Sequence, residues 1–165
     1  MTVYWGIVGN KKSGKTILVE RLTASLKSRG FMVGTIKITS HELQFDSPGK
    51  DTDRHRKSGA AVTLIKSRRQ FAAFTDSDYL DNAICDNIFA KCHLVLIEGD
   101  NTLGRQCIYV ADSNTVREDL KNKIKAIWGS QIKIGGIPNF SLHEIDNLSD
   151  FIINDFNTQL AKEAL

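Results

Sequence analysis

One segment, residues 9–16, constrains the fold of this chain more than any other part of its sequence. It reads Gly-Asn-Lys-Lys-Ser-Gly-Lys-Thr, so two glycines enclose four polar residues and a Lys-Thr dipeptide follows. The continuous apolar run before it, residues 3–8, is typical of a strand buried on both faces. Residues 17–29 carry leucines at every fourth position, which predicts an amphipathic helix that Gly30 ends. The segment therefore joins a buried strand to a helix.

A second apolar segment, residues 31–36, follows the predicted helix and predicts a strand parallel to the first. Parallel neighbours need a crossover connection, and such crossovers are right-handed. Other segments continue the alternation, with predicted strands at 60–65, 70–74, 93–97, 106–111 and 125–128, and predicted helices at 78–90 and from 145 onward. Alternating strands and helices predict an α/β fold with three layers and a mostly parallel central sheet.

Glycines at both ends of segment 9–16 let its backbone curl until successive N–H groups face one anion, and the helix N-terminus adds partial positive charge. This is a complete P-loop pattern, which a chain of this composition would contain by chance about once in a hundred. It narrows the prediction to a P-loop NTPase fold. The residues expected to bind nucleotide are Gly9, Asn10, Lys11, Lys12, Ser13, Gly14, Lys15, Thr16 and Ile17.

Two side chains of the loop and one distant acid are expected to handle the phosphates and a metal ion. Lys15 would reach the β- and γ-phosphates as a catalytic group, and the Thr16 hydroxyl would coordinate Mg²⁺. Glu98 ends the apolar run 94–97, and ligands of open α/β sheets bind at the carboxyl ends of strands. We therefore predict Thr16 and Glu98 as metal ligands. The alternative is that Glu98 only begins the next turn.

A long polar stretch, residues 39–58, reads as a loop without regular structure, and loops of this length are usually functional or mobile. A carboxylate in this stretch could hold metal-bound water, and an arginine could neutralise charge developing on a γ-phosphate. The residues that could do so are Asp46, Lys50, Asp51, Arg54, His55 and Arg56, and we take Asp51 and Arg54 as the candidate catalytic residues. The alternative is a solvated charged loop with no role in catalysis.

Length and composition favour a single nucleotide-binding domain over residues 1–165. The 22 basic and 19 acidic residues leave a formal charge of +3, which suits an anionic ligand but is too weak to indicate nucleic acid or a membrane surface as a partner. Three widely spaced cysteines without a C-x-x-C pair favour a reducing cytoplasm. Residues 1–8 indicate neither a signal peptide nor a membrane span.

Several segments together resemble the MobB family, the molybdopterin-guanine dinucleotide biosynthesis adaptor proteins. The similarity begins in residues 9–16 and continues through 29–37, and 48–60 resembles that family's Gly-Lys-Asp-Ser loop with its following Arg and Gly-Ala pair. Residues 94–99 resemble its acidic strand end, and 137–152 resemble its tail. The Gly-Lys-Asp segment, at its distance from the P-loop, makes the resemblance specific. The chain departs from the family after residue 37, where histidines are usual.

The resemblance implies a P-loop fold of the class that contains signal recognition and dimerising nucleotidases. It also implies a homodimer, GTP with Mg²⁺, and an adaptor with at most slow GTPase activity. Its implied partner is the guanylyltransferase that joins GMP to molybdopterin, with molybdopterin itself as a further candidate ligand. Carried onto this chain, the family's phosphate and metal residues are Gly14, Lys15 and Thr16, its ordered loop contains Asp51 and Arg54, and its acidic strand end is Glu98.

Two other functions remain open from the sequence. A small-molecule kinase could use ATP and Mg²⁺ at the same loop, although Arg105 and Arg117 are the only arginines after Arg69 and would supply a poor lid. An interaction module could bind nucleotide without hydrolysing it, since no residue is an obvious general base. The chain has no Asn-Lys-x-Asp motif for reading guanine, so the preference for GTP comes from the resemblance alone.

Overall fold

The computed structural model describes residues 1–77, 81–99, 105–112, 116, 118–129 and 134–164. The chain divides into two compact units. The first unit contains Met1–Thr39 and Ile88–Leu165, and the second contains Ser40–Asn87. This division does not test the single domain expected over residues 1–165, which stays a prediction.

A six-stranded sheet forms the centre of the first unit, in the order β2-β5-β1-β6-β7-β8. Every strand pair in it is parallel, which confirms the predicted α/β class with a mostly parallel sheet. The apolar runs of the sequence supply its central strands. The strands are β1 (Val3–Gly9), β2 (Val33–Lys37), β5 (Leu94–Glu98), β6 (Cys107–Val110), β7 (Ile124–Trp128) and β8 (Asn139–Phe140).

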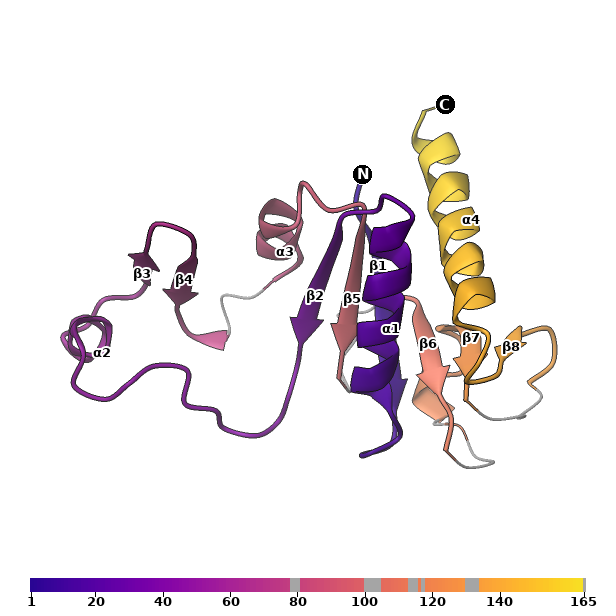
Figure 1. The fold of residues 1–165 in the computed structure, drawn as a ribbon. Helices are drawn as coiled ribbons and strands as arrows, with labels where there is room; N and C mark the ends of the chain where they lie inside the picture. The colour runs from indigo at the N-terminus through magenta and orange to yellow at the C-terminus, as the bar shows by residue number, and fades with distance from the viewer. Residues whose placement is uncertain (78–80, 100–104, 113–115, 117, 130–133, 165) are drawn as a thin grey trace. The chain divides into compact units, whose positions relative to one another are not determined.

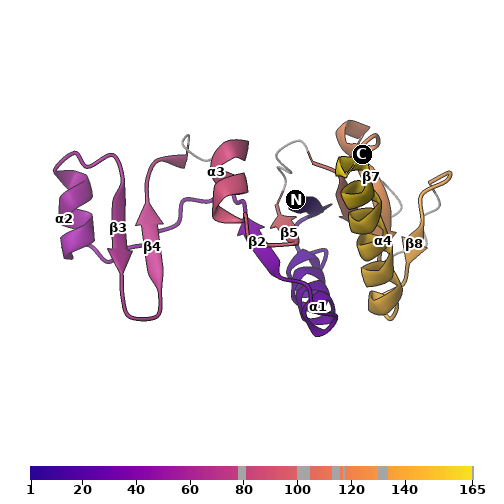
Figure 2. The same ribbon diagram turned by 90° about the horizontal axis from the view of Figure 1, so that it is seen from above.

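Helices α1 (Lys15–Ser28) and α4 (Ile145–Glu163) cover one face of this sheet (Figures 1 and 2). The leucine stripe of α1 is fully buried there, as its four-residue spacing predicts. Strand β1 contributes alternate residues, Val3, Trp5 and Ile7, to the same core, while Val8 packs into a second core on the opposite face. Burial on both faces explains why β1 reads as a continuous apolar run.

The C-terminal helix α4 begins at Ile145, as the sequence predicts, and Glu144 is its N-cap residue. A carboxylate oxygen of Glu144 accepts the backbone N–H of Ser141 at 2.7 Å, and hydrogen bonds from Ser141 and Asn147 lower the pKa of Glu144. Arg29, just beyond α1, forms ion pairs with Asp146 and Asp150 on α4. Together with the buried apolar residues of α4, these contacts hold α1, the helix that follows the P-loop, firmly in place.

Parallel strands bring their carboxyl ends to the same edge of the sheet, so β1, β2 and β5 end together. Gly99 allows a close backbone approach at this edge, because a Cβ there would lie 2.4 Å from the carbonyl oxygen of Ile38. The backbone N–H of Ile38 in turn donates to the carbonyl of Glu98 at 2.8 Å. A glycine after Glu98 therefore lets the ends of β5 and β2 stay in contact.

The second unit contains helix α2 (Asp51–Lys57) and an antiparallel hairpin of β3 (Thr63–Lys66) and β4 (Phe71–Phe74). The predicted strands and the basic turn between them are confirmed, although β3 begins later than expected. Ser67 closes the turn, since its backbone N–H donates to the carbonyl of Gln70 at 2.7 Å. The hairpin is a separate two-stranded sheet.

The prediction of an irregular loop over residues 39–58 is wrong for its second half, which forms α2. The pattern that specifies this helix is electrostatic and not apolar. Asp53 in the first turn accepts the backbone N–H of Gly49 at 2.7 Å and pairs with Lys57 one turn later at 2.8 Å. None of the residues of α2 is buried, so a search for apolar periodicity misses it.

The helix predicted over 78–90 is confirmed but shorter, as α3 (Asn82–Ile88). Asp81 precedes it and accepts the backbone N–H of Ile84 at 2.8 Å, in the manner of an N-cap, so the helix begins after this residue. The first residues of the predicted range, 78–80, lie outside the described residues. Among the described helices, none has the length and apolar character needed to span a bilayer.

Candidate functional site

The backbone of the loop between β1 and α1 has the curled conformation that its glycines predict. Gly9 has φ 153°, Lys12 has φ 66° and Gly14 has φ 98°. Gly9 cannot be replaced without movement, since a Cβ there would lie 2.4 Å from the carbonyl oxygen of Val110 on β6 and 2.9 Å from Ser13 Oγ. The first glycine of the pattern is thus needed for close packing against the neighbouring strand.

The polar groups of this loop include donors suited to an anion. Gly14 is the N-cap of α1, and no side chain caps this helix, whose first-turn N–H groups have no partner within the helix itself. The hydroxyl of Ser13 is buried and has no hydrogen-bond partner within the described part of the chain. Buried polar groups normally have partners, so an unpaired hydroxyl beside an uncapped helix N-terminus indicates a place for a phosphate.

Lys15 folds back over the loop. Its ammonium group donates to the carbonyl oxygens of Gly9 at 2.8 Å and Asn10 at 2.5 Å. The side chain therefore already lies along the loop in which a triphosphate would sit. Asn10 is fixed in turn by its side-chain amide, which donates to Asp112 after β6 at 2.8 Å.

The structure brings Thr16 and Glu98 together, as the predicted metal site requires. The Thr16 hydroxyl donates to Glu98 Oε1 at 2.7 Å, although 82 residues separate the two along the chain. Glu98 ends β5 beside β1, and its side chain is 9% exposed. The alternative was that Glu98 only begins the next turn, whereas the structure places it as the last residue of β5.

The oxygen atoms of this pair suit Mg²⁺ in type and number. Mg²⁺ prefers oxygen ligands and is usually held by one or two protein groups together with substrate phosphates and water. No cluster of three or more His, Cys, Asp or Glu side chains that could hold a metal occurs among the described residues. A hydroxyl and one carboxylate beside a phosphate loop therefore fit a magnesium ion that arrives with a nucleotide.

One member of this site, Lys37, is absent from the sequence-based set. It is the last residue of β2, lies in register with Glu98 across the β2–β5 pair, and forms an ion pair with Glu98 Oε1. Its position after a short apolar strand was a usable signal, because the ends of parallel strands meet at one edge. Using that signal required the strand order, which places β2 next to β5.

Asp51 and Arg54 lie together on α2, in the second unit, and both are exposed. Lys15, Thr16 and Glu98 all belong to the first unit. The grouping of Asp51 and Arg54 with Lys15 as catalytic residues therefore stays a prediction.

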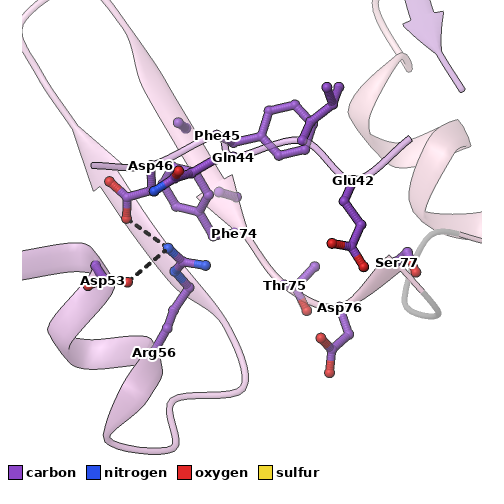
Figure 3. Close-up of a pocket in the computed structure, with 13 residues that line it drawn as sticks. Glu42, Gln44, Phe45, Asp46, Asp53, Arg56, Phe74, Thr75, Asp76 and Ser77 are labelled. Atoms are coloured by element: carbon purple, nitrogen blue, oxygen red, sulfur yellow. Dashed lines mark hydrogen bonds and ion pairs between the residues drawn. The ribbon is translucent and has the colours of Figure 1, made fainter. Parts of the chain in front are cut away.

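The half-buried face of α2 carries an internal ion-pair network (Figure 3). Arg56 pairs with Asp46 at 3.0 Å and with Asp53 at 3.8 Å, and its guanidinium lies 5.0 Å from the centroid of the Phe74 ring. A hydrogen bond from Thr52 and the Arg56 contact hold the pKa of Asp46 below its usual value. Hydrogen bonds from Lys57 and Gly49 do the same for Asp53. Arg56 and Lys57 together balance the charges of these two carboxylates within the second unit.

This network forms one wall of a groove of about 970 Å³ in the second unit. Figure 3 shows Phe45 and Phe74 beside it, with Glu42 and Asp76 near its other end. Carboxylates outnumber the single arginine along its lining, so the groove does not favour a phosphate. Among the described residues, the loop in the first unit is therefore the candidate phosphate site.

Comparison with known proteins identifies the family of this chain. Residues 4–129 match the family model described as Molybdopterin guanine dinucleotide synthesis protein B. The match contains the whole P-loop, Lys37, the α2 segment and Glu98.

Curated relatives carry the same description. The chain is 38% identical over 92 residues to the molybdopterin-guanine dinucleotide biosynthesis adapter protein of Escherichia coli, covering 53% of each chain. It is 34% identical over 104 residues to the corresponding protein of Haemophilus influenzae, covering 57% of this chain and 54% of that one. The chain spans about half the length of the curated relatives it matches.

Solved structures with this family name share the fold. The Bacillus stearothermophilus MobB homolog matches with a TM-score of 0.65 at 23% identity, over 94% of this chain and 98% of that one. Bacillus subtilis MobB matches with a TM-score of 0.68 at 22% identity, over 92% and 96% of the two chains. The P-loop fold predicted from the sequence is confirmed, and the chain belongs to the MobB family.

Proposed function

We propose that this protein is a GTP-binding adaptor that assists the guanylyltransferase step of molybdopterin guanine dinucleotide synthesis. The observation that carries the proposal is the phosphate loop with its buried Ser13 hydroxyl, beside the Thr16–Glu98 pair. The names of the relatives support the adaptor and give no support to a small-molecule kinase.

Within this proposal, residues 9–17 bind the triphosphate and Lys15 donates to its β- and γ-oxygens. Thr16 and Glu98 would hold Mg²⁺, which neutralises charge on the phosphates when it is bound. The preference for guanine over adenine is proposed because the family description names a guanine dinucleotide.

Hydrolysis is proposed to be slow. Lys15 would stabilise charge on the γ-phosphate, and Asp51 and Arg54 are proposed as further catalytic residues. Both are exposed on α2 and are therefore available to a ligand, whereas Arg56 is held by Asp46 and Asp53. Slow turnover suits an adaptor, since a bound nucleotide then lasts long enough to be sensed by a partner.

A homodimer is proposed as the working form, with the β3–β4 hairpin as its contact. An isolated two-stranded hairpin is marginally stable in water, and exposed strand edges invite pairing with another chain. Four large apolar side chains of this region are at least half exposed: Val62, Leu64, Ile65 and Phe71. Covering them with a second copy would stabilise the hairpin.

The proposed partners are the guanylyltransferase and molybdopterin, and the proposed location is the cytoplasm. Free thiols at Cys85, Cys92 and Cys107 agree with a reducing compartment.

The test is a reconstituted transfer of GMP to molybdopterin by the guanylyltransferase, with and without this protein. We expect added protein to raise the rate, and Lys15→Ala to remove the gain. Lys27→Ala, at the other end of α1, is the matched control and should act as wild type does. No gain with wild-type protein, together with no co-elution with the transferase, would reject the adaptor role.

A further inference from the structure

Lys37 and Glu98 form an ion pair at the proposed metal site. The two residues end neighbouring parallel strands and lie in register. The Glu98 side chain is 9% exposed, whereas that of Lys37 is 54% exposed. One end of the pair is therefore fixed in the sheet, and the other reaches it from solvent.

Two side chains of the described part of the chain contact the same oxygen of the Glu98 carboxylate. The Thr16 hydroxyl donates to Oε1 at 2.7 Å, and the Lys37 ammonium group is paired with that atom. A buried carboxylate without a cation is costly, so Lys37 offsets the charge of Glu98. A divalent cation bound at Glu98 would lie beside this ammonium group, and the two positive charges would repel each other.

We propose that Lys37 is a positioning residue that competes with Mg²⁺ for Glu98 and thereby couples metal binding to nucleotide binding. This proposal rests on the proposed function, since it takes the Thr16–Glu98 pair as the metal site. Without nucleotide, the Lys37–Glu98 pair keeps the affinity for metal low. A bound triphosphate attracts the lysine and the metal ion alike, so Lys37 can leave Glu98 without losing its counter-charge.

The chemistry of lysine and its position make this exchange feasible. An ammonium group on a flexible four-carbon stem is a mobile point charge, unlike the planar fork of arginine. Lys37 lies at the end of β2, an edge strand of the described sheet, and its half-exposed side chain can move without opening the core. Linkage requires that a triphosphate which raises metal affinity is itself bound more tightly when metal is present.

The experiment measures Mn²⁺ binding by electron paramagnetic resonance, using Mn²⁺ as the probe for Mg²⁺ because both prefer octahedral oxygen ligands. Without nucleotide, we expect Lys37→Met to bind Mn²⁺ about three- to tenfold more tightly than wild type, the scale of a partly exposed charge pair. Lys125→Met, an exposed lysine on β7, removes the same charge and should leave the affinity unchanged. Adding Glu98→Gln to Lys37→Met should abolish the gain.

A second measurement repeats the Mn²⁺ titration with GTP present. The factor by which GTP raises Mn²⁺ affinity should be smaller in Lys37→Met than in wild type, because the competition has been removed. A purely structural lysine would instead lower the melting temperature and leave both titrations unchanged.

Unchanged or weaker Mn²⁺ binding by nucleotide-free Lys37→Met, including no saturable binding, would overturn the proposal. That titration contains no nucleotide, so its failure is distinct from failure of the proposed function, which would appear as wild-type protein that does not bind GTP. An unchanged GTP enhancement in Lys37→Met would also overturn the coupling.

Discussion

The loop of the first unit and helix α2 of the second unit are both rich in charged residues, but they differ in how these groups are satisfied. In the loop, a buried Ser13 hydroxyl has no partner among the residues that the structure describes, and α1 begins without a side-chain cap. On α2, Arg56 is paired with Asp46 and Asp53, and Lys57 is paired with Asp53. We infer from this difference that the loop is a ligand site, whereas Arg56, Lys57 and their acidic partners stabilise the second unit.

The largest expected effect comes from Gly9→Ala, which tests whether the conformation of the loop is needed for ligand binding. The new Cβ would lie 2.4 Å from the carbonyl of Val110, so the loop must shift. We expect the free energy of unfolding to fall by about 1–3 kcal/mol and GTP affinity to fall about a hundredfold or more. Calorimetric binding and chemical denaturation measure the two quantities.

The matched control for Gly9→Ala is Gly30→Ala. Gly30 also has a positive φ, 85°, but nothing lies within 4 Å of its Cβ position. The Gly30→Ala variant should lose about 1 kcal/mol of stability from backbone strain, and its GTP binding should stay intact. Equal loss of GTP binding in both variants would mean that general instability, and not the loop, explains the result.

A smaller effect is expected for Glu98→Gln, which keeps the shape of the metal site and removes its charge. GTP binding in EDTA should be little changed, whereas the gain in affinity on adding Mg²⁺ should shrink about tenfold, since one charge-assisted contact is lost. Glu118→Gln, whose exposed side chain pairs with Lys121, is the control and should behave as wild type. An undiminished gain with Mg²⁺ in Glu98→Gln would place the metal elsewhere.

Arg54 and Arg56 of helix α2 test whether the paired charges of the second unit stabilise its structure. Arg56→Ala removes one partner from each of Asp46 and Asp53, so the melting temperature should fall by a few degrees while GTP affinity stays the same. Arg54→Ala, on the exposed side, should leave the melting temperature unchanged and slow single-turnover GTP hydrolysis. The reverse pattern would show that Arg56 serves the nucleotide and Arg54 the fold.

The smallest effect is expected from pH. The pKa values of Asp46 and Asp53 are lowered in the folded chain, so their contribution to stability is present above the unfolded value of about 3.9 and is lost as pH falls through the lower folded values. Thermal melts between pH 6 and pH 3 should show a loss of stability below about pH 4. Over this pH range, the Arg56→Ala variant should lose less stability than the wild-type protein does. Identical pH profiles for the two proteins would contradict the network.

The sequence predicts the first unit well because its signals are local and strong. Continuous apolar runs give β1 and β5, the four-residue leucine spacing gives α1, and the Gly-Lys-Thr pattern gives the loop. The meeting of Thr16 with Glu98 follows from the rule that parallel strands end at one edge. Here local pattern and overall topology agree.

The second unit is harder to predict because its signals are weak or nonlocal. Helix α2 has no buried face, and only charged groups in its first and last turns mark it. The contact of Asp46 with Arg56 joins an irregular segment to that helix, and neither residue type shows the pairing in the sequence. Lys37 is missed for a similar reason, since its role depends on strand order.

The central claim is that the loop binds GTP through Lys15, and calorimetry of GTP and ATP with Mg²⁺ on wild type and Lys15→Ala tests it most directly. The account predicts tighter binding of GTP than of ATP by wild type. It also predicts a loss of about 1.5–3 kcal/mol in Lys15→Ala, which is about ten- to more than a hundredfold in affinity. Equal or tighter binding of ATP, or undiminished GTP binding by Lys15→Ala, would contradict it.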